Sequence, residues 1–138
     1  MPSADKFVGV YGLHKSENFD EYMKALGVGM ILRNLGNTAK PTLTVTANGD
    51  SLKFFSQTTL KNTTIEFTIG KEAESSTMDG RKIKSTVVWD GEKLKEVQVS
   101  VDGKGKTTTI EREMNDEGDL VITCTVDNIV GVRVYRKK

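Results

Sequence analysis

The sequence predicts an all-β fold, an antiparallel up-and-down barrel capped by two short helices. Turn signals rich in Gly, Asn and Asp recur, most of them roughly 8–12 residues apart, which is the spacing of an antiparallel sandwich or barrel. The runs between these turns are rich in Thr and Val, which favour a pleated sheet. One segment, 18–37, has the periodicity of a helix instead. Closing such a meander into a barrel removes its exposed edges.

The strands are expected before and after the helical segment. One strand precedes residue 18, and about nine follow, which is within the usual range for a barrel. The clearest runs are 42–47, 51–56, 82–89, 94–101, 107–112, 120–126 and 130–136. The turns between them are expected near residues 48–50, 79–80, 90–91, 102–103, 117–118 and 127–128, because Gly, Asn and Asp tolerate a positive φ.

The segment 18–37 predicts a helix–turn–helix. Asn18 is expected to cap the first helix, with Glu21 reaching back in a capping box. Gly27 is expected to end this helix, and Gly36 to end a second helix that starts near residue 29. The apolar stripe of the first helix is formed by Phe19, Tyr22, Met23 and Leu26. Two short helices at this position would form a lid over a barrel that can enclose a ligand cavity.

Length, charge and cysteine content place the protein in a broad class. The 138 residues indicate one domain, 1–138, with a real core. A net charge of +1 gives no reason to expect a nucleic-acid partner. The N-terminus lacks the pattern of a secretory signal, and no apolar run approaches the ~18 residues of a membrane span. The single cysteine cannot form an internal disulfide. We expect a cytoplasmic monomer, with entry into the nucleus left open.

The residues that carry most enzyme chemistry are missing from the pattern. His14 stands alone and is interpreted as an exposed strand residue, and Cys124 as a buried small side chain. One histidine and one cysteine do not predict a metal site. The glycines at 102–106 do not join a strand to a helix, so they predict a hairpin and not a phosphate loop. We predict a protein without catalytic residues, metal or cofactor, and an isomerase built on a barrel is the least favoured class.

Two arginines are harder to place. Alternation puts Arg112 on the same strand face as Thr108, Ile110 and Met114, which favours an inward side chain. The alternative is that Arg112 extends to the barrel end or pairs with a surface glutamate. If it is inside, it needs a partner, and the pattern offers no inward Asp or Glu nearby. In 130–136 the valines alternate with Arg133 and Tyr135, so the pattern alone predicts that this pair faces water.

Several segments, taken in order, resemble the intracellular lipid-binding proteins, that is, the fatty-acid-binding protein family, especially its heart, adipocyte and invertebrate muscle members. The opening FVGVYGLHKSENFDEYMKALGVG (7–29) is similar to the signature of this family. KPT (40–42), LKNTTIEF (60–67), DGRKIKS (79–85), TTTIERE (107–113) and VRVYRK (132–137) match in the same order. The resemblance extends over essentially the whole chain.

This resemblance implies a ten-stranded β-clam with a helical lid and a large, partly hydrated cavity. It implies that Arg112, Arg133 and Tyr135 hold a ligand carboxylate, so that Arg133 and Tyr135 point inward. It also implies a set of cavity and portal residues, namely Phe19, Tyr22, Met23, Val28, Leu32, Leu60, Met78, Asp79, Arg81, Ile110 and Cys124. The implied function is a non-enzymatic carrier that reversibly binds a long-chain fatty acid or a similar hydrophobic carboxylate. A retinoic-acid-type carrier, or a lipid sensor that delivers its ligand to a nuclear partner, remains the alternative.

The chain departs from the family pattern at a few positions. Tyr11 replaces the commoner tryptophan of the first strand, and Leu60 replaces a portal phenylalanine. Leu32 is bulkier and Gly36 smaller than is usual there. Basic residues also gather on or beside the lid, at Lys15, Lys24, Arg33 and Lys40. They form either a solvated face or a surface for transient contact with anionic membranes.

Overall fold

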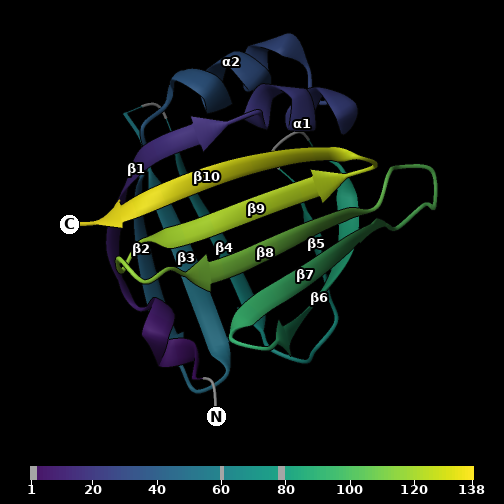
Figure 1. The fold of residues 1–138 in the computed structure, drawn as a ribbon. Coiled ribbons are helices and arrows are strands. Elements are labelled where there is room, and N and C mark those ends of the chain that lie inside the picture. Colours follow the sequence, from purple (N-terminus) through teal and green to yellow (C-terminus); the bar gives the residue numbers. More distant parts are fainter. Residues whose placement is uncertain (1–2, 60, 78–79) are drawn as a thin grey trace.

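The computed structural model describes residues 3–59, 61–77 and 80–138, and within them it forms one antiparallel sheet of ten strands (Figure 1). The strands are β1 (Gly9–Glu17), β2 (Thr42–Asn48), β3 (Ser51–Gln57), β4 (Asn62–Thr68), β5 (Ala73–Ser76), β6 (Lys82–Asp90), β7 (Lys93–Ser100), β8 (Thr108–Met114), β9 (Leu120–Val126) and β10 (Ile129–Lys137). This confirms the predicted all-β, ten-stranded fold.

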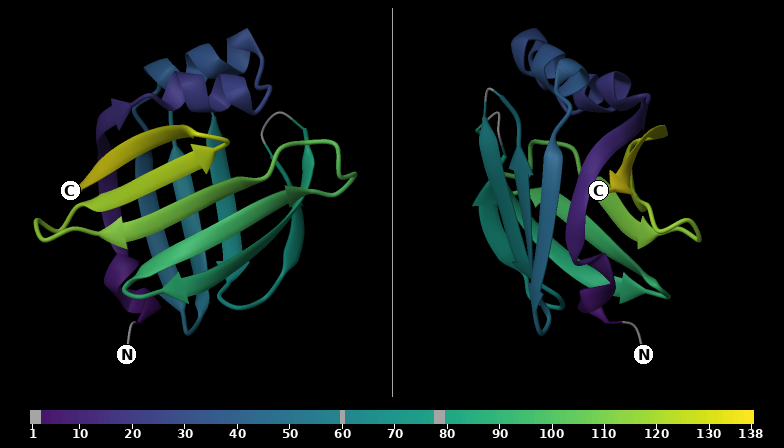
Figure 2. Two further views of the ribbon diagram at one scale, coloured as in Figure 1. Left: turned by 45° about the vertical axis from the view of Figure 1, so that its right-hand side comes forward. Right: turned by 90° about the vertical axis from the view of Figure 1, so that its left-hand side faces the viewer.

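The sheet curls into a barrel that is nearly closed. Its strand order is β4-β3-β2-β1-β10-β9-β8-β7-β6-β5, so the first strand of the chain pairs with the last. Figure 2 shows the result as two layers of strands, with β2, β3 and β4 behind β7, β8, β9 and β10. The pairing of β1 with β10 shifts register between Leu13 and Lys15, which leaves His14 in a bulge. His14 is exposed there, as predicted.

Two helices, α1 (Phe19–Ala25) and α2 (Met30–Thr38), cover one end of the barrel as a lid (Figure 1). The predicted capping box is wrong. Asn18 adopts a left-handed conformation with φ of 57°, and its Nδ2 donates to the carbonyl of Val130 at 2.9 Å and not to the helix. Asparagine tolerates this conformation, which turns its side chain back toward β10. Asn18 therefore fastens the start of the lid to the barrel.

The second helix does not end at Gly36, contrary to the prediction, but continues to Thr38. A Cβ at Gly36 would lie 3.1 Å from Sδ of Met23, so glycine is explained here by the close packing of α2 on α1. The helix ends where Ala39 takes an extended conformation, two residues before Pro41. Glycine therefore marks a helix contact at this position and not a helix end.

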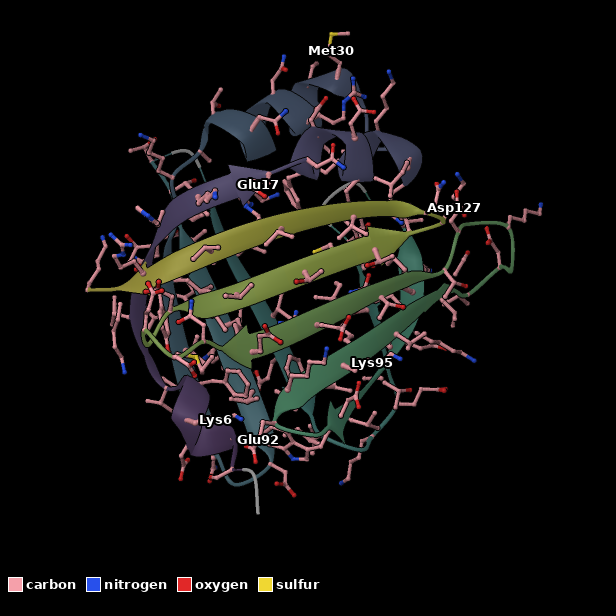
Figure 3. All side chains as sticks on the ribbon, in the orientation of Figure 1. Lys6, Glu17, Met30, Glu92, Lys95 and Asp127 are labelled. Carbon is pink, nitrogen blue, oxygen red and sulfur yellow. The ribbon has the colours of Figure 1, made fainter. Side chains whose placement is uncertain are left out.

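The end of the barrel opposite the lid is closed by a short 3-10 helix, η1 (Ala4–Phe7), that the sequence did not predict. The Phe7 ring is fully buried and stacks on Trp89, with 6.2 Å between the ring centroids. Tyr11 is also fully buried, and its hydroxyl donates to the Phe7 carbonyl at 2.8 Å. Lys6 binds Glu92 beside these rings, and Figure 3 shows the two side chains at this end. Tyr11 thus belongs to the core far from the lid.

A second, smaller hydrophobic cluster joins the lid to the sheet. Its buried members are Tyr22, Met23, Cys124 and Val126. Cys124 is buried as predicted, and that burial raises the pKa of its thiol to about 11. On β10, a Cβ at Gly131 would lie 3.2 Å from the backbone of Asn18 and of Phe19. The missing side chain at Gly131 therefore lets α1 lie directly on β10.

Candidate functional site

A cavity of about 790 Å³ lies beneath the lid. This volume falls within the ~300–1,000 Å³ of typical small-molecule sites. Six residues that the resemblance assigned to the cavity line its wall: Phe19, Tyr22, Met23, Val28, Leu32 and Arg81. The wall also includes residues that the resemblance did not assign to the cavity, among them Leu26, Leu35, Gly36, Lys40, Thr63 and Gln98. The lid helices and the near ends of the strands therefore enclose it together.

The other residues assigned to the cavity lie elsewhere or outside the described part of the chain. Ile110 and Cys124 belong to the cluster that packs beneath α1 with Tyr22 and Met23. Leu60, Met78 and Asp79 lie outside the described residues. Beside the Cys124 cluster, the Tyr22 hydroxyl lies 2.5 Å from Oγ1 of Thr108, and burial raises the pKa of that tyrosine. This polar contact under α1 was not predicted.

Arg133 points toward the inside of the barrel. Its guanidinium carbon lies 4.4 Å from the centroid of the Phe19 ring, and its Nη2 donates to the Gly36 carbonyl at 3.5 Å. The residues on the same face of β10, Gly131 and Tyr135, are both buried, while Val130 is exposed. The orientation drawn from alternation alone is therefore wrong, and the one implied by the resemblance is correct. Residues i and i+2 of a strand share a face, so Arg133 and Tyr135 both lie on the inward face of β10.

Arg112 is also inside, and only 4% of its surface is exposed. Its guanidinium carbon lies 5.0 Å from the Phe54 ring and 5.2 Å from the Phe67 ring. Its Nη1 donates to Oε1 of Glu96 at 2.6 Å. The expectation that no inward acid would lie near Arg112 is wrong, because Glu96 is 3% exposed.

Glu96 faces inward because of its place in β7. The fully buried Leu94 is two residues away and therefore shares its strand face. Leu94 stands opposite Arg112 in the β7–β8 ladder, which puts Glu96 one step along the same face. The sequence held one signal for this. Leu94 and Glu96 alternate with Lys95 and Val97, so an inward Leu94 would have predicted an inward Glu96.

Each arginine keeps one donor without a partner. The Nε atoms of Arg112 and Arg133 are buried and have no hydrogen-bond partner among the described residues. Buried donors in proteins are almost always bonded, so an unbonded pair indicates a place for a ligand or water. Burial raises the pKa of Tyr135, while the positive charges of Arg133 and Arg112 act in the opposite direction. The guanidinium carbon of Arg133 lies 5.9 Å from the centroid of the Tyr135 ring. Of the three residues, Arg133 lines the cavity beneath the lid.

The basic residues of the lid are not a uniform charged face. Arg33 donates from Nε to Asp20 at 3.2 Å and from Nη1 to the Val28 carbonyl at 2.8 Å. Lys15 is paired with Glu17 at 2.7 Å. Two of the four basic residues near the lid are therefore already bound to acids.

Neither a metal site nor a membrane-spanning helix is found in the described ranges. No group of three or more His, Cys, Asp or Glu side chains there is arranged to hold a metal ion. No helix in those ranges has the length and apolar character needed to cross a bilayer.

The barrel, its lid and its internal arginines define a class of protein. The model of the lipocalin / cytosolic fatty-acid binding protein family matches residues 8–138. The chain belongs to this family, whose fatty-acid-binding carriers are not enzymes.

Solved structures of three invertebrate proteins are similar to it over nearly the full length. A fatty-acid-binding protein from Drosophila melanogaster brain is 46% identical, over 94% of this chain and 98% of that chain, with a TM-score of 0.82. Fatty-acid-binding protein 1 of Echinococcus granulosus is 36% identical, over 96% and 98%, with a TM-score of 0.86. A Schistosoma mansoni fatty acid binding protein in complex with arachidonic acid is 36% identical, over 96% of both chains, with a TM-score of 0.86.

Proposed function

We propose that this protein is a cytosolic carrier that reversibly binds a long-chain fatty acid in the cavity beneath the lid, with the carboxylate held by Arg112, Arg133 and Tyr135. The observation that carries the proposal is the pair of buried, unbonded Nε donors, one on Arg112 and one on Arg133. A guanidinium offers donors in a planar fork that matches a carboxylate, and a tyrosine hydroxyl adds a rotatable one. The similar Schistosoma mansoni protein was solved with arachidonic acid, which is a ligand of this class.

The acyl chain supplies most of the affinity. Burial contributes ~0.8 kcal/mol per methylene, so a chain of about sixteen carbons gains about 12 kcal/mol before the costs of immobilisation. Apolar lining residues such as Leu26, Val28 and Leu32 offer the surface for that burial. This term does not distinguish a carboxylate from another head group, so the selectivity is assigned to the arginines.

Arg133→Ala tests the carboxylate site. Losing one partner of a buried charged hydrogen bond costs about 2–5 kcal/mol, so fatty-acid affinity should fall by at least about thirtyfold. Arg81→Ala, at another cavity arginine, should weaken binding less, and Arg136→Ala, on the exposed face, should leave it unchanged. Calorimetric titration with one fatty acid measures all three. Equal, small losses in Arg133→Ala and Arg136→Ala would show that the head group lies elsewhere.

The lid also offers a surface for contact with membranes, through which the carrier would load and release its ligand. Met30 and Ile31 begin α2 and are 67% and 79% exposed. Figure 3 shows Met30 at the outer end of the lid, pointing away from the barrel. Because two of the four basic residues, Arg33 and Lys15, are paired with acids, we assign the larger part of this contact to the apolar pair.

A further inference from the structure

The pair formed by Arg112 and Glu96 changes the charge of the proposed head-group site. Both carboxylate oxygens of Glu96 already accept a hydrogen bond, Oε1 from Arg112 at 2.6 Å and Oε2 from Gln98 at 2.8 Å. Gln98 also lines the cavity, so it connects Glu96 to the space that a ligand occupies. The charge of Arg112 is thus neutralised at contact distance before any ligand arrives.

Arg133 is in a different situation. Its contacts are the Phe19 ring, the Tyr135 ring and the Gly36 carbonyl. No acidic partner of Arg133 is found in the part of the chain that the structure describes. The two arginines and Glu96 together carry about one net positive charge and not two.

A ligand carboxylate that approached Arg112 would therefore be a second carboxylate on one guanidinium. Two like charges in a buried site repel each other, and the repulsion acts on a charged head group alone. An uncharged amide or hydroxyl does not meet this repulsion. Its oxygen can accept from the unbonded Nε donors of Arg112 and Arg133, and its own N–H or O–H can donate to Glu96.

We infer that Glu96, buried behind Gln98 of the cavity wall, is a specificity-determining residue of the proposed head-group site, which lowers the preference for carboxylate lipids over uncharged amide or alcohol lipids of the same chain length. This inference rests on the proposed function, because it places the head group at Arg112 and Arg133. It extends the ligand class from fatty acids to their neutral amide and alcohol analogues.

The test compares one fatty acid with its primary amide, for example oleic acid with oleamide. Dissociation constants are measured by displacement of a fluorescent probe whose own affinity is determined for each variant. In Glu96→Gln, the ratio of the amide constant to the acid constant should rise by about fivefold or more, since the internal negative charge is gone. In Glu66→Gln, which removes an exposed negative charge from β4, the ratio should stay within about twofold. A smaller rise in Glu96→Gln, or an equal rise in Glu66→Gln, overturns the inference.

The wild-type protein gives a second readout that needs no variant. Its amide-to-acid ratio should be below about tenfold, because Glu96 offsets part of the site's charge. If Glu96→Gln does not fold, the wild-type ratio alone tests the inference. A wild-type ratio of about tenfold or more overturns it. Arg133→Ala separates the two proposals. If it weakens acid binding while Glu96→Gln leaves the ratio unmoved, the carrier function stands and only the role of Glu96 fails.

Discussion

Asp20 of α1 holds Arg33 of α2, with Oδ1 3.2 Å from Nε, and the same oxygen accepts from Asn37 at 2.8 Å. These contacts fasten the two lid helices to each other. The helices themselves rest differently on the barrel, since α1 buries Tyr22 and Met23 while α2 has no buried residue. The second helix therefore depends on the first for its position.

Asp20→Ala is expected to loosen the lid with little effect on stability. The pair is partly exposed, so its loss should lower the free energy of unfolding by no more than about 1 kcal/mol. Ligand exchange should become faster, because α2 would leave its place over the cavity more often. Stopped-flow dissociation of a fluorescent fatty acid measures the rate. Glu17→Ala, which breaks the surface pair with Lys15, is the control and should not change the rate.

Arg112→Met is expected to destabilise the fold, apart from any effect on binding. It would leave the carboxylate of Glu96 buried without its cation, which costs about 3–5 kcal/mol in comparable pairs. The double variant Arg112→Met with Glu96→Leu should recover most of this loss, because no buried charge remains. Urea unfolding measures both. Lys93→Met, which removes the cation of a partly exposed pair with Glu111, should cost less than about 1 kcal/mol.

The thiol of Cys124 provides a test that depends on pH. Burial raises the pKa of this thiol from 9.0 to about 11, so the folded protein keeps it protonated where the unfolded chain ionises it. The contribution to stability is complete below pH 9 and is lost as the pH rises through about 11. Alkylation of the native protein at pH 8 should be at least about tenfold slower than that of the unfolded chain. Comparable rates in the two states would show that the thiol is accessible.

Removing the exposed apolar pair of α2 should slow the transfer of ligand to membranes. In the double variant Met30→Ser with Ile31→Ser, the apolar contact is lost, so transfer of a fluorescent fatty acid to anionic vesicles should slow by about threefold or more. Val88→Ser changes an exposed valine on β6 and should leave the rate unchanged. Fatty-acid affinity should stay constant in both. An unchanged transfer rate in the double variant would exclude the lid as the docking surface.

Gly131→Ala should displace α1 from β10. The new methyl group would meet the backbone of Asn18 and Phe19 at 3.2 Å, and backbone atoms cannot give way as a side chain can. A loss of about 1–3 kcal/mol in the free energy of unfolding is expected. Gly36→Ala is the matched comparison, because its methyl group would meet the flexible end of Met23 at 3.1 Å. Thermal unfolding of both variants measures the difference, and an equal loss in the two would contradict this reason.

The barrel and its lid could be predicted from the sequence because turn signals and periodicity are local. The orientation of β10 could not, since alternation shows that two faces differ but not which one faces inward. Alternation is normally resolved by placing apolar residues in a dry core. Here Arg133 and Tyr135 lie inside and Val130 outside, and only the family resemblance indicated this.

Glu96 was missed for a related reason. A glutamate on a strand is usually exposed, so the glutamate considered as a partner of Arg112 was one at the surface. Burial of Glu96 depends on Arg112, which is 16 residues away in the chain and joins it only when β7 pairs with β8. Asn18 is similar, because its partner Val130 lies 112 residues away. Alternation with Leu94 could have indicated the face of Glu96, but no local pattern indicates which distant residue it contacts.

The strand order shows where the barrel can become wider. It begins at β4 and ends at β5, so among the described strands these two are each bonded to a neighbour on one side alone. All other neighbouring strands in this order are joined by a ladder of backbone hydrogen bonds. A barrel of this construction has a seam, and it can widen along that seam without breaking a ladder.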